Sequence, residues 1–245
     1  MRDWRGRLLR ALGIEAAEAG QVAAGFTMFL CLFAAYFLLR PVRETMGVAG
    51  GVDNLQWLFT GTFVATLLAF PLYGAVARRV PTRAILPLVF GFFAFNLVCF
   101  ALALWRWPGH IGLARAFYIW LSVFNLIAIS LAWSVLVDNF SATQAKRTFG
   151  LCAAGASVGG MLGPLLAVAL VGPIGHAGLL LASAALLLAS TVAAGTIRRD
   201  AAPAAAPREA LGGNPFQGAI DVARSPYLLG IACFMVLLAT VSTFL

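Results

Sequence analysis

The sequence predicts an all-α polytopic membrane protein, and three observations support that prediction. The first is a series of long uncharged stretches, each bounded by charged residues. A helix rises about 1.5 Å per residue and the hydrocarbon core is about 30 Å thick, so about 20 apolar residues make one crossing. The second is composition: the chain is 62% hydrophobic and 11% charged, whereas soluble proteins average about 25% charged residues. The third is the placement of the basic residues, which gather in alternate loops.

The uncharged stretches give the expected number of crossings. They measure 21, 24, 22 and 22 residues, then 50, and then 21 up to the last residue. The 50-residue stretch is interrupted by the turn-forming run Gly172-Pro173-Ile174-Gly175, which indicates two crossings joined by a hairpin. We therefore expect seven helices, over residues 21–44, 55–77, 84–105, 115–137, 148–171, 177–197 and 226–245.

Loop lengths divide the chain into four regions. Residues 1–20 are expected to form a short cytoplasmic segment and residues 21–197 a bundle of six closely connected helices. Residues 198–225 are rich in Ala, Pro and Gly, as in a flexible cytoplasmic linker. The helix over 226–245 then reads as the start of a second bundle in a longer chain.

The basic residues predict the orientation. Thirteen of the 17 Lys and Arg residues fall in segments on the same side as the N-terminus. Cytoplasmic loops carry an excess of Lys and Arg, so the N-terminus is expected in the cytoplasm and the protein in the cell (inner) membrane. This asymmetry explains the net charge of +8 without a nucleic-acid partner.

The sequence offers no site for a metal or a cofactor. Four cysteines, Cys31, Cys99, Cys152 and Cys233, all fall inside expected spans, far apart, and read as small buried apolar residues. The two histidines lie in different loops. No nucleophile elbow, phosphate-binding loop or paired carboxylate motif occurs, so we do not expect an enzyme.

Three ionisable residues cluster at the end of the first expected helix. Arg40, Arg43 and Glu44 stand at i, i+3 and i+4, so they share one face if the helix continues that far. Ionisable groups at membrane depth usually face a partner or a water-filled cavity, and Arg offers a planar fork of donors to an anion. Alternatively, the two arginines extend to the headgroups while Glu44 pairs with one of them.

A polar stripe runs along the fourth expected helix. Arg115, Tyr118, Ser122 and Asn125 fall at helical spacing. Polar groups within a span need partners or water, so this stripe is expected to face the bundle interior and contact a solute, with Asn96 of the third helix as a further candidate. Hydrogen bonds between helices would explain the stripe equally well.

Small residues mark one face of the fifth expected helix. Gly155, Gly159 and Gly163 are spaced four apart and Pro164 follows. Such a face lets a neighbouring backbone approach closely. We therefore expect a helix-packing interface here, with or without a role in transport.

These features resemble the N-terminal half of a major facilitator superfamily transporter. The spacing of Gly150, Gly159 and Gly163-Pro164 is similar to the fifth-helix glycine pattern of that superfamily, although Ala167 and Val168 replace its closing glycines. Gly74 and the arginines of the 74–83 loop partly match its loop motif, with Arg78 in the acidic position. The resemblance implies an MFS-type six-helix bundle whose missing C-terminal half would be a second bundle.

A closer resemblance is to the bacterial ATP/ADP translocase-like branch. It rests on the segments 35–47, Trp57-Leu58-Phe59-Thr60, Ser122-Val123-Phe124-Asn125 and Lys146-Arg147-Thr148-Phe149-Gly150. The resemblance implies a secondary transporter, and nucleotide exchange is one activity within that family.

Three functions follow as expectations. The first is alternating-access transport of a small, anionic solute handled by arginines. The second is a proton-coupled drug exporter, although the first six expected spans contain no central carboxylate. The third is a membrane scaffold or partner subunit that transports nothing. The expected partners are the lipid bilayer and, in the first two cases, a small-molecule solute.

Overall fold

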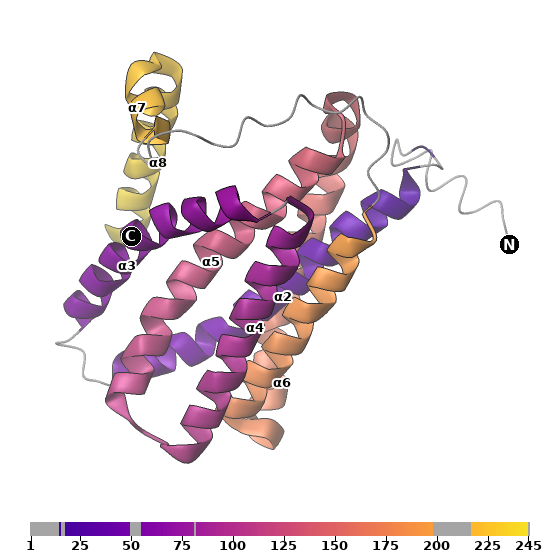
Figure 1. Cartoon of the computed structure of the whole chain (residues 1–245). Coiled ribbons are helices and arrows are strands. Elements are labelled where there is room, and N and C mark those ends of the chain that lie inside the picture. Colours follow the sequence, from indigo (N-terminus) through magenta and orange to yellow (C-terminus); the bar gives the residue numbers. More distant parts are fainter. Residues whose placement is uncertain (1–14, 16–17, 50–54, 81, 198–216, 245) are drawn as a thin grey trace, which may run out of the picture.

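The computed structural model describes residues 15, 18–49, 55–80, 82–197 and 217–244, and all regular structure in these ranges is helical (Figure 1). Seven helical elements follow one another along the described chain. They are α2 (Ala19–Ala49), α3 (Leu55–Arg79), α4 (Thr82–Arg106), α5 (Ile111–Asn139), α6 (Ala142–Gly195), α7 (Gln217–Arg224) and α8 (Pro226–Phe244). The N-terminal segment, apart from Glu15 and the residues from Glu18 onward, lies outside these ranges, as does linker 198–216.

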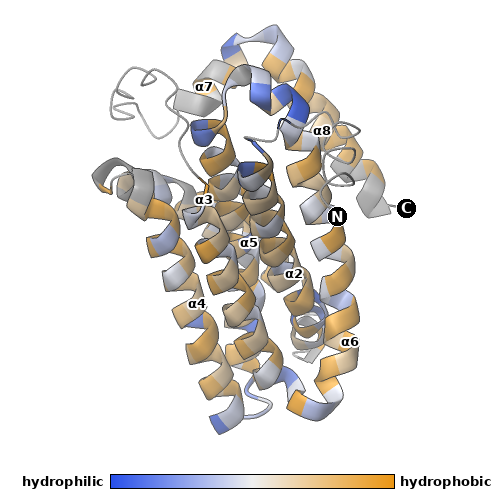
Figure 2. Ribbon diagram, turned by 90° about the vertical axis from the view of Figure 1, so that its right-hand side faces the viewer, coloured by the Kyte–Doolittle hydropathy of each residue, from blue (hydrophilic) through white to orange (hydrophobic). Residues whose placement is uncertain are grey.

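Five helices, α2 to α6, are long and apolar enough to cross a membrane. Figure 2 shows hydrophobic residues along most of their length and hydrophilic residues gathered near their ends. The chain is thus an all-α protein of membrane type. Seven spans were expected. The fifth and sixth correspond to two helical arms that are joined within α6, and the seventh corresponds to α8, whose apolar stretch is shorter, Pro226–Leu238.

The element α6 consists of two arms that meet at Gly175. This glycine alone departs from helical backbone angles, with φ 64° and ψ −176°. A left-handed φ is readily adopted only by glycine, which explains the residue type at the reversal. The expected turn over 172–175 is therefore confined to its last residue. The first arm covers 142–174 and the second 176–195, and both pack against α2 (Figure 1).

The first arm runs parallel to α2 in a constant register. Arg147 contacts Glu18, 129 residues earlier in the chain. The glycine stripe repeats this offset, since a Cβ added at Gly155 or Gly159 would collide with the carbonyl of Phe26 or Leu30. At Gly163 it would lie 2.9 Å from the carbonyl of Ala34. The sequence prediction of a close backbone crossing is confirmed, and Pro164 lies inside the same helical arm.

The second arm runs antiparallel to α2. The Ser183 hydroxyl donates to the carbonyl of Ala35 at 3.0 Å, and the Ser190 hydroxyl to that of Met28 at 2.9 Å. Both serines are fully buried. From Ser183 to Ser190 the chain advances seven residues, and the accepting carbonyl moves seven residues back along α2, from Ala35 to Met28. This arm therefore runs in the direction opposite to α2. Helix α2 is therefore packed against both arms of α6.

Helices α3 and α4 pack on α5 through aromatic and small residues. Phe93 and Phe100 of α4 meet Trp120 of α5, with ring centroids 5.7 and 5.3 Å apart. On α3, a Cβ added at Gly61 would lie 2.9 Å from the Ile119 side chain of α5. These contacts hold α3 and α4 against α5, which also packs against α2.

Two further expectations need correction. Residues 217–224, which were placed in the linker, form the short helix α7, and α7 packs against α8. Of the four cysteines, Cys31 and Cys152 are buried as expected, whereas Cys99 and Cys233 lie on the surface. In a membrane that surface faces lipid or another subunit, so an apolar thiol there carries no cost.

Candidate anion site at the end of α2

The site lies where α2 ends and α5 begins, and Arg43 is its centre. Helix α2 continues through Pro41 to Ala49, so Arg43 and Glu44 stand on helical backbone as the sequence argument required. The Arg43 Nε donates to the carbonyl of Tyr118 at 3.4 Å, and Nη2 donates to Ser122 Oγ at 3.3 Å. The structure thus joins Arg43, Tyr118 and Ser122, three residues that the sequence singled out on two separate helices.

The Tyr118 ring covers one face of the guanidinium group. The Arg43 Cζ lies 3.8 Å from the ring centroid, and the Arg43 side chain is only 16% exposed. A partly desolvated cation over an aromatic face gains about 1–2 kcal/mol from the ring quadrupole. The neutral groups of α5 therefore replace part of the water around the Arg43 guanidinium group but supply no negative charge.

Neighbouring residues hold Tyr118 in place. A Cβ added at Gly47 of α2 would lie 2.8 Å from the Tyr118 ring, so the absence of a side chain at Gly47 makes room for the ring. Phe59 of α3 meets the same ring edge-on, with centroids 6.4 Å apart. Three helices therefore define the position of the guanidinium group.

Glu44 contacts Arg43 on the exposed side of the cluster. Its Oε1 lies 3.0 Å from Arg43 Nη1, and its side chain is 59% exposed. Glu44 thus pairs with one of the two arginines, its neighbour Arg43. Arg43 then uses three of its five N–H donors on Tyr118, Ser122 and Glu44, and two remain for a further acceptor.

Three candidate residues do not join this cluster. Arg40 is exposed, and its guanidinium carbon lies 5.6 Å from the Phe37 ring centroid on its own helix. Asn96 Nδ2 donates to the carbonyl of Phe92 within α4 at 2.7 Å. Arg115 is exposed in the first turns of α5. The sequence predicted that Arg40 and Arg43 would act together, whereas in the structure only Arg43 belongs to the cluster.

Asn125 lies one turn further along the stripe of α5. Its Oδ1 atom is buried and accepts no hydrogen bond from the described residues. A buried acceptor without a donor costs about 1–3 kcal/mol, so this atom favours a donor supplied by water or a ligand. Asn125 therefore remains a candidate for solute contact, but a weaker one than Ser122.

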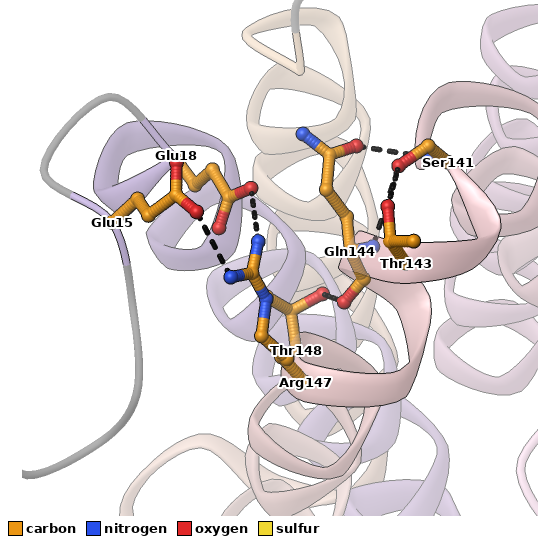
Figure 3. Close-up of polar contacts among 7 residues, drawn as sticks. All are labelled: Glu15, Glu18, Ser141, Thr143, Gln144, Arg147 and Thr148. Atoms are coloured by element: carbon orange, nitrogen blue, oxygen red, sulfur yellow. Dashed lines mark hydrogen bonds and ion pairs between the residues drawn. The ribbon is translucent and has the colours of Figure 1, made fainter.

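A second polar group, which the sequence argument missed, lies at the opposite end of α2 (Figure 3). Arg147 of α6 reaches between Glu15 and Glu18, with each N–O distance 2.9 Å. The Glu18 side chain is 6% exposed and that of Glu15 is 63% exposed. The available sequence signal was that Arg147 stands eight residues before Gly155, in step with the four-residue spacing of the glycine stripe.

The helix start beside Arg147 is closed by a capping box. The Ser141 hydroxyl accepts from the Gln144 backbone N–H at 3.3 Å, and the Gln144 side chain accepts from the Ser141 N–H at 2.9 Å (Figure 3). Two otherwise unpaired backbone donors are satisfied in this way. The cap fixes where α6 begins and hence the register of Arg147 with Glu18.

No metal-binding group of His, Cys, Asp and Glu side chains occurs across the described ranges. Comparison with known proteins adds no assignment. No protein-family model matches the chain, and neither a curated protein nor a solved structure shows significant similarity to it.

Proposed function

We propose that the protein is a secondary transporter, or one half of one, that moves a small anionic solute across the cell membrane by alternating access. The N-terminus lies in the cytoplasm in this proposal, so the Arg43 cluster is at the outer end of the bundle. The bundle of α2 to α6 forms one wall of the pathway, and a second bundle, from the same polypeptide or from a partner, forms the other. The exposed apolar side chains of α8, such as Phe234 and Leu237, suit contact with such a bundle.

The observation that supports this proposal most strongly is the placement of Arg43. A single arginine at the end of a membrane helix could be an anchor that reaches the headgroups. Arg43 instead turns toward α5, where its guanidinium group is mostly buried and held at three points. An arginine fixed in this way with two free N–H donors is prepared for an oxyanion, because carboxylate and phosphate oxygens match its fork.

Asn125 adds a constraint on the solute. Its unpartnered Oδ1 lies on the same stripe as Ser122, about 5 Å further along the helix axis by the helical rise. A solute that combines an acidic group with an N–H or O–H donor would satisfy both positions. Nucleotides and hydroxy acids both fit this description, so the resemblance to nucleotide exchangers is compatible with it.

A scaffold function is the second candidate, favoured by one observation. The contacts of Arg43 with Tyr118 and Ser122 also bind α2 to α5, and they would do so in a protein that transports nothing. A drug exporter is less favoured, because the carboxylate nearest to the site, Glu44, is largely exposed and paired.

Transport in proteoliposomes distinguishes these functions. The full-length protein should take up one or more radiolabelled anions from a panel of nucleotides, sugar phosphates and organic acids. Arg43→Gln should abolish that uptake, whereas Arg115→Gln, which removes an exposed arginine outside the cluster, should leave it nearly unchanged. Absence of uptake for the whole panel, with the protein folded and inserted, would favour the scaffold function.

A further inference from the structure

We infer that Glu44 is a built-in competitor for the solute at Arg43, so that an oxyanion binds by displacing the Glu44 carboxylate from the guanidinium group. This inference rests on the proposed function and adds how the site recognises its solute. It assigns Glu44 to competition with the ligand.

The contacts of Arg43 divide into fixed and movable partners. Tyr118 is buried, and its backbone carbonyl and ring belong to the rigid helix α5. Ser122 is also on α5 and is bonded back to the Tyr118 carbonyl at 3.5 Å. Glu44 differs, because its side chain is 59% exposed and the structure gives it one ion-pair contact, 3.0 Å from Nη1. Glu44 can therefore turn into solvent while Arg43 stays in place.

The Glu44 carboxylate has the chemistry of the proposed ligand. It places one anionic oxygen on Nη1, the same kind of atom that a carboxylate or phosphate would bring. A neutral solute could not replace it without leaving Arg43 uncompensated. The exchange therefore selects for ligands with at least one negative charge and rejects neutral analogues of the same shape.

The strength of this competition follows from the exposure of the pair. Exposed ion pairs contribute up to about 1 kcal/mol, which corresponds to a factor of about five in affinity. Removing the carboxylate also removes its repulsion of the incoming anion. Glu44→Gln should therefore bind an oxyanion about fivefold more tightly than the original protein.

Equilibrium dialysis of the detergent-solubilised protein with radiolabelled sulfate tests the inference. Sulfate is a small tetrahedral oxyanion whose charge does not change near neutral pH. Glu44→Gln should lower the sulfate Kd about fivefold. Glu15→Gln is the matched control, because it removes an equally exposed paired carboxylate at the other end of α2 and should leave the sulfate Kd unchanged.

Arg43→Gln separates this inference from the proposed function. If Arg43→Gln removes sulfate binding but Glu44→Gln leaves it equal or weaker, Glu44 positions Arg43 and the inference is wrong, while the anion site stands. If Arg43→Gln binds sulfate as the original protein does, the anion site itself is wrong. If the folded Glu44→Gln protein binds no sulfate, or Glu15→Gln tightens binding as much, the competition is also excluded.

Discussion

Gly159 of α6 lies directly against the backbone carbonyl of Leu30 in α2, with no room for a Cβ atom between the two helices. The same offset along the chain joins Arg147 to Glu18 at one end of this crossing. The α2 residues in these contacts run from Glu18 to Ala34, which are 16 positions apart. At about 1.5 Å per residue the contacts extend over about 24 Å, most of a membrane crossing. One parallel helix pair therefore sets the register on which the rest of the bundle is built.

Gly159→Leu should sharply reduce the yield of folded protein in detergent. The new side chain would meet the Leu30 carbonyl and the Ala34 backbone nitrogen, and helix backbone cannot yield as a flexible side chain can. Overpacking of this kind costs about 1–3 kcal/mol or more. Ala169→Leu is the control, because Ala169 is exposed on the same arm. Equal monodisperse yields by size-exclusion chromatography would show that the glycine stripe has no packing role.

Ser183→Ala and Ser190→Ala should each lower thermal stability in detergent. Each change removes a buried donor from a carbonyl of α2, and such bonds between membrane helices contribute about 0.6 kcal/mol and up to about 1.7. The two effects should add, because the serines are seven residues apart. Thr191→Val should have little effect, since the Thr191 hydroxyl donates within its own helix to Leu187. If Thr191→Val destabilises as much as the serine changes, the second arm is not held by these bonds.

Arg147→Gln should destabilise the protein more than Glu15→Gln. Loss of Arg147 leaves the buried Glu18 carboxylate without its cation, whereas Glu15 is mostly in solvent. Arg147 is partly exposed, so its loss should cost less than breaking a fully buried ion pair but more than the loss of Glu15. Glu15→Gln should stay within about 1 kcal/mol. Thermal unfolding monitored by tryptophan fluorescence compares the two variants, and equal shifts would mean that Glu18 is not stabilised by Arg147.

Cysteine labelling should test the proposed orientation. In a cysteine-free background, Pro108→Cys and His176→Cys should react with a membrane-impermeant maleimide added to intact cells, and Ala204→Cys should not. Pro108 and His176 are exposed and neighbour Gly109 and Gly175, whose positive φ values make those glycines poor sites for substitution. Labelling of Ala204→Cys from outside would reverse the topology.

The elements that sequence predicted well are those governed by a single physical constraint. The lengths of the uncharged stretches predicted where the central parts of α2 to α5 lie. The four-residue spacing of Gly155, Gly159 and Gly163 predicted a close contact between two helix backbones. The helical stripe on α5 correctly placed Tyr118 and Ser122 on one side, where Arg43 meets them.

Features that depend on two segments at once were harder to predict. Arg40 and Arg43 look equivalent in the sequence, yet only Arg43 turns toward α5, because Gly47 leaves space for the Tyr118 ring beside it. Ser183 and Ser190 gave a signal in their seven-residue spacing, but their acceptors are backbone carbonyls, which every residue carries. The hairpin between the two arms of α6 was expected over 172–175, but the pattern did not show that Gly175 would be its non-helical residue.

In the proposed function, Arg43 recognises an anion through the geometry of its guanidinium group and not through charge alone. Uptake of the transported anion into proteoliposomes should be compared for Arg43→Lys and Arg40→Lys. Lysine keeps the charge but loses the planar fork, so Arg43→Lys should reduce uptake about tenfold or more at equal folded yield, in line with the strength of charge-assisted hydrogen bonds. Arg40→Lys should transport nearly as the original protein does, because Arg40 lies outside the cluster. Full transport by Arg43→Lys would contradict the account.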